Sequence, residues 1–423
     1  MGDPVDAVRA RWYPAPMRST STPDAGGIPA LWALDPRVTF LNHGSFGARL
    51  NTVLEAQQRL RERVERQPLR FFIRDLEPLL EAARAELAQF VDVDPQDLVF
   101  VPNATAGVNT VLRSLTFEPG DELLTTDHEY NACRNALDAA AARTGARVVV
   151  APIPLPLTSP DDVVNAVVAR AGARTRLALL DHVTSQTGMV LPIARLVAAL
   201  NERGIDTLVD GAHAPGMLPL SLRAIGAAYY TGNCHKWICA PISAALLHVR
   251  RDRQALIRPL SISHGANSPR TDRSRFLLEF AWTGTGDPTS YLCVPEAIRA
   301  MGALLPGGWP ALMADNHQKA LDGRATLCAA LGVAPPCPDE MVGSLAIVAL
   351  PDSRSSHALS PLHTDPLQDA LLERFGIEVP IVPWPAWPKR LVRISAQIYN
   401  NREQYASLAA ALLELLEEER TAG

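Results

Sequence analysis

Residues 206–237, DTLVDGAHAPGMLPLSLRAIGAAYYTGNCHKW, contain two apolar runs that each lead into a charged side chain. The first run ends at Asp210, with His213 shortly after it, and the second leads to Lys236. In open α/β sheets, ligands gather at the carboxyl ends of the strands, so polar residues that directly follow an apolar run are candidates for a site. The stretch therefore predicts two strands of one sheet with functional residues at their ends.

The chain on both sides of this stretch alternates between short strands and longer helical segments. From Val38 onward, β-branched runs of about five residues alternate with Ala- and Leu-rich segments of about a dozen, which is typical of a mostly parallel sheet flanked by helices. After about Gly302 the order changes to helix, strand, helix, strand and closing helix, which indicates a smaller α/β domain. We expect an N-terminal arm at residues 1–36, a large domain at 37–300 and a small C-terminal domain at 301–423.

Composition and charge narrow the class of function. A chain of 423 residues that is 47% hydrophobic can bury a large core. The net charge of -5 gives no basic field for nucleic acid or an anionic membrane surface, and no apolar run is long enough to span a bilayer. The N-terminus has no apolar signal segment, and the six cysteines show no C-x-x-C spacing. We expect a cytoplasmic chain with reduced thiols, a small-molecule substrate, and no nucleic acid, membrane or metal.

Two other stretches could bind an anion. In VFVPNATAGVN, a strand runs into a helix start at which Asn103, Ala104 and Thr105 could offer backbone N–H groups and a hydroxyl to a phosphate, although an ordinary capped helix is the alternative. FAWTGTGDPTSY is a Gly- and Thr-rich loop that could approach an anion closely or form a simple turn.

Lys236 and Asp210 add an amine and a carboxylate to the possible anion sites. A lysine with apolar sequence on both sides is desolvated, and an amine with a lowered pKa suits Schiff-base chemistry, unless its head group reaches the surface. A carboxylate at a strand end can likewise be only a turn or cap residue. Together, an anion site, a carboxylate and an amine after successive strands match what pyridoxal 5'-phosphate needs for its phosphate, its ring nitrogen and its aldehyde.

Seven motifs, in order, resemble the class V aminotransferase family of fold type I. They are NATAGVN, TTDHEYNAC, DHVTSQTG, LVDGAHAPG, YYTGNCHKW, WTGTGDPTSY and VRISAQIYN. Within the family the chain looks most like the isopenicillin N epimerase group, which is related to cysteine desulfurases and cysteine-conjugate C–S lyases. The resemblance implies a pyridoxal 5'-phosphate enzyme with an amino-acid substrate, and a homodimer whose active sites are shared between subunits.

The resemblance also implies roles for individual residues around the cofactor. Lys236 matches the Schiff-base lysine, Asp210 the partner of the pyridinium nitrogen, and His128 the catalytic residue that stacks on the ring. The other implied cofactor contacts are Ala104, Thr105, Asn233 and His235 at the phosphate, Ser185 and His213 near the phenolic oxygen, and Thr285 at the phosphate of the other subunit. Desulfurases more often have a serine where Asn233 stands.

The substrate is implied to meet residues from three other segments. Arg393 matches the arginine that grips the substrate α-carboxylate, with a surface strand cation as the alternative. Asn42 and His43 match a segment close to the substrate, with a simple turn as the alternative. Tyr130 is a possible substitute for His128 and a candidate contact of the substrate.

One departure from the desulfurase pattern narrows the chemistry. Residues 373–393, ERFGIEVPIVPWPAWPKRLVR, contain no cysteine where desulfurases place a nucleophile before the carboxylate-binding arginine. Cys234 is expected to be a small buried thiol, and Cys337 lies too far upstream for that role. Persulfide chemistry of the desulfurase kind is therefore not expected.

Our leading hypothesis is β-elimination, a C–S lyase reaction on an S-substituted cysteine, in secondary metabolism such as antibiotic biosynthesis. The missing nucleophile and the lack of an evident second base favour it. Epimerisation of an amino acid is the first alternative and needs a second acid, for which His43 and Tyr130 are candidates. A further alternative is decarboxylation with oxidative deamination to an aldehyde. Transamination is less favoured. A non-catalytic scaffold protein would be expected to lack Lys236 or Asp210.

Overall fold

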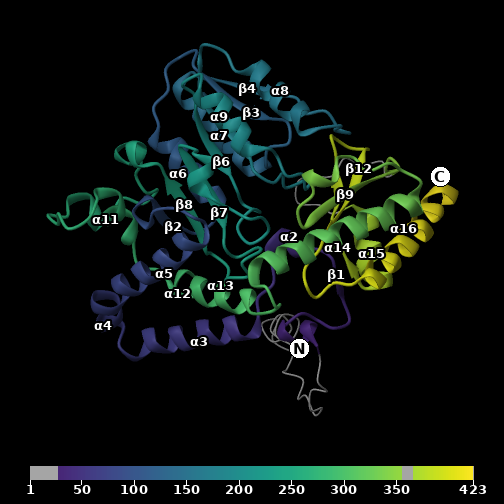
Figure 1. Ribbon diagram of the computed structural model, residues 1–423, viewed down its shortest axis with the longest axis horizontal. Helices are drawn as coiled ribbons and strands as arrows, with labels where there is room; N and C mark the ends of the chain where they lie inside the picture. The colour runs from purple at the N-terminus through teal and green to yellow at the C-terminus, as the bar shows by residue number, and fades with distance from the viewer. Residues whose placement is uncertain (1–26, 355–364, 423) are drawn as a thin grey trace, which may run out of the picture.

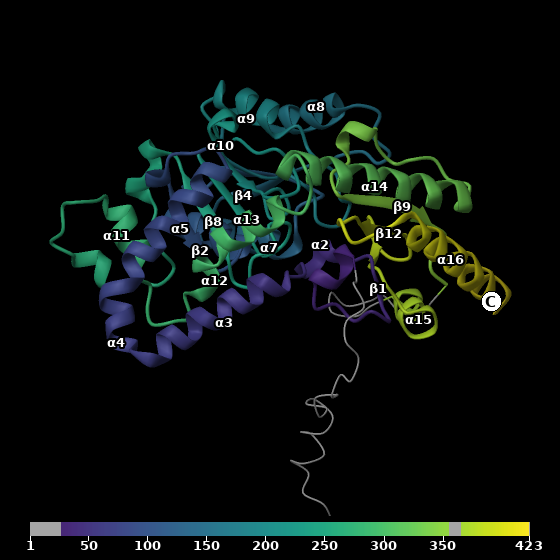
Figure 2. The same cartoon turned by 60° about the horizontal axis from the view of Figure 1, so that its bottom comes forward.

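The computed structural model describes residues 27–354 and 365–422. Most of the expected N-terminal arm, residues 1–26, lies outside this described part. A larger body around a seven-stranded sheet lies beside a smaller body that carries helices α14 and α16 (Figure 1). Helix α3 extends along one edge of the larger body, as the turned view shows (Figure 2).

The central sheet has the strand order β2-β8-β7-β6-β5-β3-β4. Strands β4, β3, β5, β6 and β7 run parallel to one another, whereas β8 is antiparallel to both β7 and β2. The strands are β2 (Leu98–Val101), β3 (Glu122–Thr126), β4 (Arg147–Ala151), β5 (Thr175–Asp181), β6 (Asp206–Asp210), β7 (Tyr229–Asn233) and β8 (Ala245–Val249). The expected mostly parallel sheet is confirmed, and the two strands of the 206–237 stretch are neighbours in it.

Helices cover both faces of this sheet because alternate strand residues point to opposite sides. Leu177 and Leu179 of β5 belong to a core cluster with α6, α7 and α11, whereas Ala178 and Leu180 belong to a cluster with α3, α5, α8, α9 and α13. These helices are α3 (Asn51–Arg66), α5 (Leu76–Phe90), α6 (Ala104–Ser114), α7 (Asn131–Thr144), α8 (Pro160–Arg170), α9 (Ile193–Asn201), α11 (Arg275–Ala281) and α13 (Val294–Gly302). The result is a three-layer α/β/α arrangement.

Short helical turns connect these elements. They are α2 (His43–Phe46), α4 (Pro68–Arg70), α10 (Leu222–Ile225), α12 (Thr289–Leu292), the 3₁₀ turns η1 (Ile28–Leu31), η3 (Pro95–Asp97), η4 (Arg251–Leu256), η5 (His264–Asn267) and η6 (Asp339–Met341), and the π turn η2 (Phe71–Asp75). Local sequence sets several helix ends. A capping box at Ser159 and Asp162 starts α8, and Gly145, in the left-handed conformation at φ +77°, ends α7.

The smaller body contains an antiparallel sheet of order β11-β12-β9. Its elements are β9 (Leu345–Leu350), β11 (Ile381–Pro383), β12 (Arg390–Ser395), α14 (Gly308–Leu331), α15 (Pro366–Phe375) and α16 (Arg402–Ala422). Strand β1 (Thr39–Phe40), from the start of the described chain, pairs in parallel with β10 (Ile377–Glu378), which follows α15. The domain boundaries remain predictions, and the expected division between residues 300 and 301 lies inside α13.

The described residues show two further general properties. None of the described helices combines the length and the hydropathy that a membrane span requires. All six cysteines are free and buried, including Cys234, whose thiol pKa is raised by burial. Cys337 is also buried, and its backbone carbonyl accepts a hydrogen bond from the Arg324 side chain at 2.9 Å.

Candidate functional site

The Lys236 amine lies just after β7 and meets the side chain of His213. Lys236 Nζ is 3.0 Å from His213 Nε2, and the Trp237 indole N–H donates to His213 Nδ1 at 3.4 Å. A neutral imidazole that accepts at Nδ1 carries its proton on Nε2, so His213 donates to the lysine nitrogen. Burial, together with nearby Arg393, lowers the pKa of Lys236 to about 7. About half of the amine is therefore uncharged at neutral pH, and most of it is uncharged at higher pH.

The segment that contains α2 contacts the backbone of Lys236. His43 is fully buried, its Nε2 lies 3.1 Å from the Lys236 carbonyl oxygen, and its Nδ1 lies 2.8 Å from the Tyr399 hydroxyl. Gly47 comes after this turn with φ +72°, and a Cβ there would lie 2.3 Å from the His235 carbonyl oxygen. The predicted substrate contact His43 is thus placed behind the lysine, with both ring nitrogens taken by protein atoms.

Gly47 should not tolerate a side chain. In Gly47→Ala, a backbone cost of about 1–3 kcal/mol adds to a direct collision with the backbone beside Lys236, because φ +72° with ψ 169° is a conformation almost confined to glycine. We therefore expect a clear loss of stability and of cofactor retention. Gly204→Ala is the matched control, because Gly204 has φ +71° and open space around its Cβ position. Chemical unfolding and cofactor absorbance measure both effects. Equal losses in the two variants would show that the close approach of Gly47 to the lysine is unimportant.

Asp210 ends strand β6, beside the lysine, and is only 2% exposed. Its Oδ1 accepts from the Ala212 N–H at 2.9 Å, and its Oδ2 accepts from the Cys133 thiol, on α7, at 3.0 Å. Burial raises the pKa of this carboxyl group, whereas the two donors and Lys236 lower it. A buried carboxyl group with two donors suits a role as the partner of a cation.

His128 is fixed at both ring nitrogens just before α7. Its Nδ1 lies 2.7 Å from the Thr187 hydroxyl and its Nε2 lies 3.3 Å from the Ile153 carbonyl oxygen. Burial lowers the pKa of His128, which favours a neutral ring. Trp384, in the β11–β12 turn of the smaller body, packs against it with ring centroids 4.3 Å apart. The ring is therefore uncharged and immobilised, as a stacking residue requires.

The start of α6 lies against the end of β7. Asn103 caps the helix by accepting from the Ala106 N–H at 2.8 Å, and Asn233 Oδ1 accepts from the Ala104 N–H at 2.9 Å. The ordinary cap is therefore present, and it stands directly beside Asn233. Thr105 in the first turn is partly buried, and His235 Nδ1 is 3.0 Å from the Ala244 carbonyl oxygen. These residues form a polar corner at a positive helix end.

Arg393 on β12 is a buried cation, 5% exposed, that lacks a carboxylate partner among the described residues. Its Nη1 donates to the Ser185 carbonyl, its Nη2 donates to Ser45 Oγ at 2.9 Å, and its Nε has no partner in the described part of the chain. The hydroxyl of Ser45 in turn donates to Asn42 Oδ1 at 2.5 Å. A buried guanidinium with unused hydrogen-bonding capacity is suited to an anionic ligand.

Arg393→Ala should weaken substrate binding and leave the cofactor in place. We expect KM to rise about 100-fold, because one partner of a buried charge pair is lost, whereas Arg393→Lys should be intermediate because it keeps the charge without the fork. A substrate whose α-carboxylate is replaced by an amide gives the matched control. Wild-type protein should discriminate strongly against the amide and Arg393→Ala should not. Cofactor loss from the alanine variant would instead assign Arg393 a structural role.

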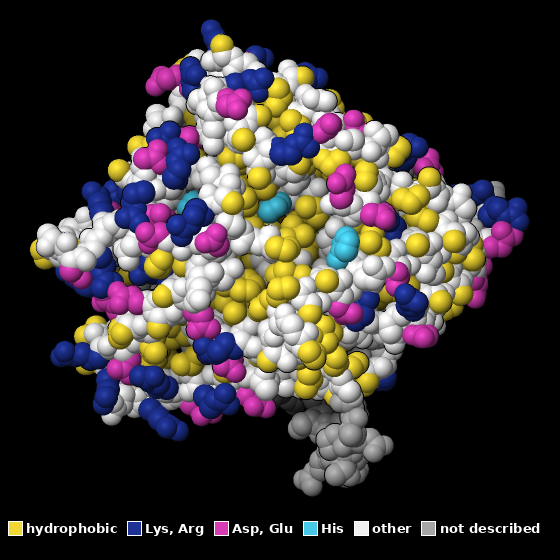
Figure 3. All heavy atoms as spheres, in the orientation of Figure 1, with side chains coloured by type: hydrophobic (Ala, Val, Ile, Leu, Met, Phe, Trp, Pro, Cys, Tyr) yellow, Lys and Arg dark blue, Asp and Glu magenta, His cyan; other side chains and the backbone are white. Residues whose placement is uncertain are grey.

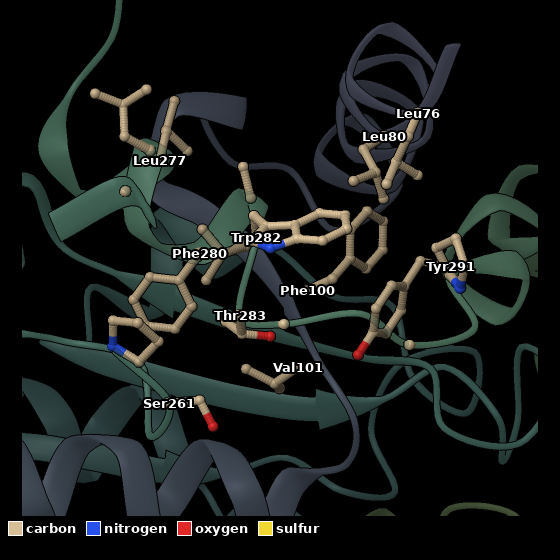
Figure 4. A pocket seen from close by; sticks show the side chains of 18 of the residues that line it. Leu76, Leu80, Phe100, Val101, Ser261, Leu277, Phe280, Trp282, Thr283 and Tyr291 are labelled. Carbon is tan, nitrogen blue, oxygen red and sulfur yellow. The ribbon is translucent and has the colours of Figure 1, made fainter. Parts of the chain in front are cut away.

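Two predicted site residues lie in more open positions. Tyr130 is 41% exposed. The charge of Asp210 raises the pKa of Tyr130 and that of Arg393 lowers it, so Tyr130 lies near both side chains. Thr285 is exposed and lines a different cavity, the Trp282 pocket, whose wall includes Phe100, Trp282 and Tyr291 (Figure 4). The structure thus brings His43, His213, Asp210 and Arg393 close to Lys236 and places Thr285 among residues of another surface.

The donor set fits pyridoxal 5'-phosphate. It contains a primary amine with a lowered pKa, a buried carboxyl group at the adjacent strand end, a fixed aromatic ring and a polar helix start. The buried, unpaired Nε of Arg393 would be available to a carboxylate. Lys236 would bind the aldehyde, Asp210 would face the ring nitrogen, and Asn233 with the start of α6 would face the phosphate.

Comparison with known proteins supports the same cofactor. The sequence profile described as Aminotransferase class-V matches residues 52–276. The chain belongs to this family. The match confirms the family, the fold and the cofactor expected from the sequence, and the protein is an enzyme.

Alignments with similar proteins cover nearly the whole chain. Isopenicillin N epimerase of Amycolatopsis lactamdurans is 36% identical over 397 residues, which cover 90% of this chain and 96% of that enzyme. Putative L-cysteine desulfhydrase 1 of Oryza sativa subsp. japonica is 33% identical, covering 90% of this chain and 83% of the rice protein. A structure of the cystine C–S lyase C-DES with its product cysteine persulfide has a TM-score of 0.74 at 24% identity and covers 91% of this chain and 98% of that one, which shows a shared fold.

Sequence reasoning missed four residues that support the site. Cys133 and Glu129 lie beside Asp210 and His128, Thr187 holds the His128 ring, and Trp384 covers it. Cys133, Glu129 and Thr187 stand inside quoted motifs, so their position in those motifs was the available signal. The Trp-Pro repeat at 384–388 stands out in the sequence only as biased composition.

Proposed function

We propose that this protein is a pyridoxal-phosphate-dependent C–S lyase of secondary metabolism that removes the sulfur substituent of an S-substituted cysteine by β-elimination. The observation that carries the proposal is the single well-placed base. A large fraction of the Lys236 amine is neutral near pH 7, because its pKa is lowered to about 7, whereas His43, the first candidate for a second acid, is buried with both ring nitrogens occupied. β-Elimination needs one such base, and inversion of a centre needs an acid on the opposite face.

Three residues divide substrate binding, proton transfer and charge stabilisation among them. Arg393 binds the α-carboxylate through its planar fork and so orients the substrate. Lys236 removes the Cα proton, and the carboxylate of Asp210 stabilises positive charge facing it. When bound, pyridoxal 5'-phosphate supplies the electron sink for the bond broken at Cα. The carbon–sulfur bond then breaks, the sulfur leaves as a thiol, and the remaining 2-aminoacrylate reacts with water to give pyruvate and ammonia.

Epimerisation is a second candidate reaction, supported by the position of Tyr130 and by the name of one similar protein. Tyr130 is exposed, lies near Asp210 and Arg393, and carries a hydroxyl that could protonate the substrate from another side. The 36% identical protein from Amycolatopsis lactamdurans is named for that reaction. The two reactions share the first proton transfer and differ in the second step, which is loss of the sulfur substituent in one and reprotonation of Cα in the other.

The deciding experiment identifies products formed in deuterated water. Holoenzyme is incubated with a panel of S-conjugated cysteines and plain amino acids, and the products are analysed by mass spectrometry, with Lys236→Ala as the blank. We expect a thiol together with pyruvate. Deuterium at Cα of an otherwise intact substrate would establish the epimerase, and carbon dioxide with an aldehyde would exclude both.

We also propose that the enzyme acts as a cytoplasmic homodimer with shared active sites. Apolar side chains gather near the centre of the face shown in Figure 3, with charged ones around them. The Trp282 pocket, a cavity of about 650 Å³, has apolar and charged residues in its wall, and exposed apolar residues belong to its lining or stand close to lining residues in the sequence. These are Leu69, Ile73, Leu260 and Ile262. Such a surface supports packing against a second copy, with Thr285 reaching the cofactor phosphate of the other subunit.

Mixing two defective variants tests this sharing. A heterodimer of Lys236→Ala and Thr285→Ala chains would contain one site with both residues intact. Random pairing makes half of the dimers mixed, each with one of two sites restored, so we expect about one quarter of wild-type activity. Cofactor is kept low enough that Thr285→Ala alone is largely unloaded. Activity equal to the mean of the two separate variants would contradict a site shared through Thr285.

A further inference from the structure

Three buried carboxyl groups converge around the end of β6, and two of them have no role in the proposed reaction. We call Glu129, Asp181, Asp210 and the Cys133 thiol the acid cluster. Ligating atoms of Glu129, Cys133 and Asp210 all lie within 4.8 Å of one another, and Asp181 is the register partner of Asp210 on neighbouring β5. The side chains of the three acids are 6%, 2% and 2% exposed. Three negative charges in so small a buried volume would repel one another strongly.

The hydrogen bonds within the acid cluster are unequal. Asp210 accepts from the Ala212 N–H and from the Cys133 thiol. Glu129 accepts on Oε2 from the Thr125 hydroxyl at 3.3 Å, while Glu129 Oε1 and Asp181 Oδ2 have no partner among the described residues. A buried carboxylate without donors is far more costly than a buried neutral acid. Asp210 is therefore the member best able to hold a negative charge.

Few cations face the acid cluster. The charged and titratable groups around it are Tyr130 and Arg134 from α7 and its start, Tyr230 and Lys236 from β7 and the segment after it, and Arg393, which acts on Lys236 and Tyr130. Lys236 is the cation that acts on both Asp181 and Asp210, and it is largely uncharged above pH 7. Burial and mutual repulsion raise the pKa values of Glu129 and Asp181 well above their usual range.

We propose that Glu129 and Asp181 are uncharged carboxylic acids in the folded enzyme and that the one negative charge of the acid cluster lies on Asp210. Cys133 is then a positioning residue, whose thiol holds the Asp210 carboxylate in place. The benefit concerns Lys236, because ionised neighbours would keep its amine protonated and unable to act as a base. That benefit rests on the proposed function, whereas the distribution of charge can be tested without any turnover.

Infrared spectroscopy of the holoenzyme tests the charge distribution directly. Neutral carboxylic acids have a carbonyl stretch that shifts in deuterated water, and we expect such a band in wild-type protein at neutral pH. Glu129→Gln and Asp181→Asn should each remove part of it. Glu279→Gln is the matched control, because Glu279 is equally buried but paired with Arg258 and Arg275, so the band should remain. Absence of the band, or its persistence in both cluster variants, would overturn the proposal.

The pH dependence of stability gives a second readout. A carboxyl group whose folded pKa is raised stabilises the fold at low pH, and this contribution is lost as pH rises from the unfolded toward the folded pKa. Glu129→Gln should therefore match wild-type stability near pH 4 and exceed it increasingly at higher pH. A constant difference across this range would contradict a neutral Glu129, and Asp181→Asn serves if the first variant does not fold.

Cys133 is tested by cofactor affinity. Cys133→Ala removes a donor to a charged group and should weaken cofactor binding about tenfold, whereas Cys133→Ser should restore it. Equal binding in all three proteins would remove the positioning role. Zinc binding by wild-type protein that is lost in Cys133→Ala would reassign the acid cluster to a metal and overturn its proposed charge. The infrared result stands even if the enzyme proves not to be a lyase.

Discussion

Lys236→Ala should abolish both the visible absorbance of the lysine-bound cofactor and measurable turnover. The variant removes the only amine beside Asp210 and His213 in the described part of the chain, so the cofactor loses its covalent attachment and the substrate loses its base. Loss of a general base alone lowers rates by about 10²–10⁴-fold, and loss of the attachment adds to this. Absorbance of purified protein and single-turnover kinetics measure the two effects separately.

The chain offers an unusually clean control for this variant. It contains only three lysines, Lys236, Lys319 and Lys389, and Lys389 lies on the exposed β11–β12 turn. Lys389→Ala should keep wild-type absorbance and rate, and borohydride reduction with subsequent peptide mapping should find the cofactor on Lys236 alone. Visible absorbance that survives in Lys236→Ala would show that another amine carries the cofactor.

The lowered pKa of Lys236 predicts how capture of the cofactor depends on pH. Only the neutral amine attacks an aldehyde, and its fraction rises as pH increases through about 7. The rate of cofactor capture by cofactor-free protein should therefore rise across neutral pH and level off in the alkaline range. A rise centred near the pKa of an ordinary lysine would show that the amine is not desolvated.

Asp210→Asn should lower kcat by about 10²–10³-fold while the fold is preserved. The change keeps the shape of a side chain that accepts from Ala212 and Cys133, but it removes the negative charge of the group that would face the ring nitrogen. Losing one well-placed electrostatic partner of a transition state has effects of about this size. Steady-state kinetics and the absorbance spectrum of the bound cofactor measure the result.

Asp206→Asn is the matched control for this change. Asp206 starts the same strand but pairs at the surface with Arg250 and Arg253. It should leave kcat within a factor of about two, as surface ion pairs contribute little. If Asp210→Asn turned over as fast as this control, the carboxylate would not be needed for the reaction, and the cofactor would have to be protonated by another group.

The sequence made the strands of the sheet and their polar ends predictable for a physical reason. A buried strand is a continuous apolar run, so the residue that ends it, such as Asp210, is marked by its contrast with the residues before it. The family motifs then supplied roles for Lys236 and Arg393. Neither source says which side chains from distant segments touch these residues.

The contacts that support the site could not be predicted from the sequence, because they join segments far apart in the chain. His43 meets the Lys236 carbonyl across 193 positions, and Cys133 meets Asp210 across 77. Trp384 reaches His128 only because the β11–β12 turn of the smaller body packs against the larger one. Such pairs depend on how whole layers pack, and each residue alone is an ordinary buried aromatic, thiol or imidazole.

The pairing of β1 with β10 has a consequence for the order in which the enzyme matures during synthesis. The stretch that supports Lys236 from behind is anchored by Thr39 and Leu41, whose N–H groups donate to Gly376 and Glu378. A ribosome delivers these two acceptors long after the large sheet has emerged. A nascent chain released before Glu378 would therefore contain Lys236, Asp210 and His128 and still bind cofactor poorly, so loading with cofactor should be among the last events in biogenesis.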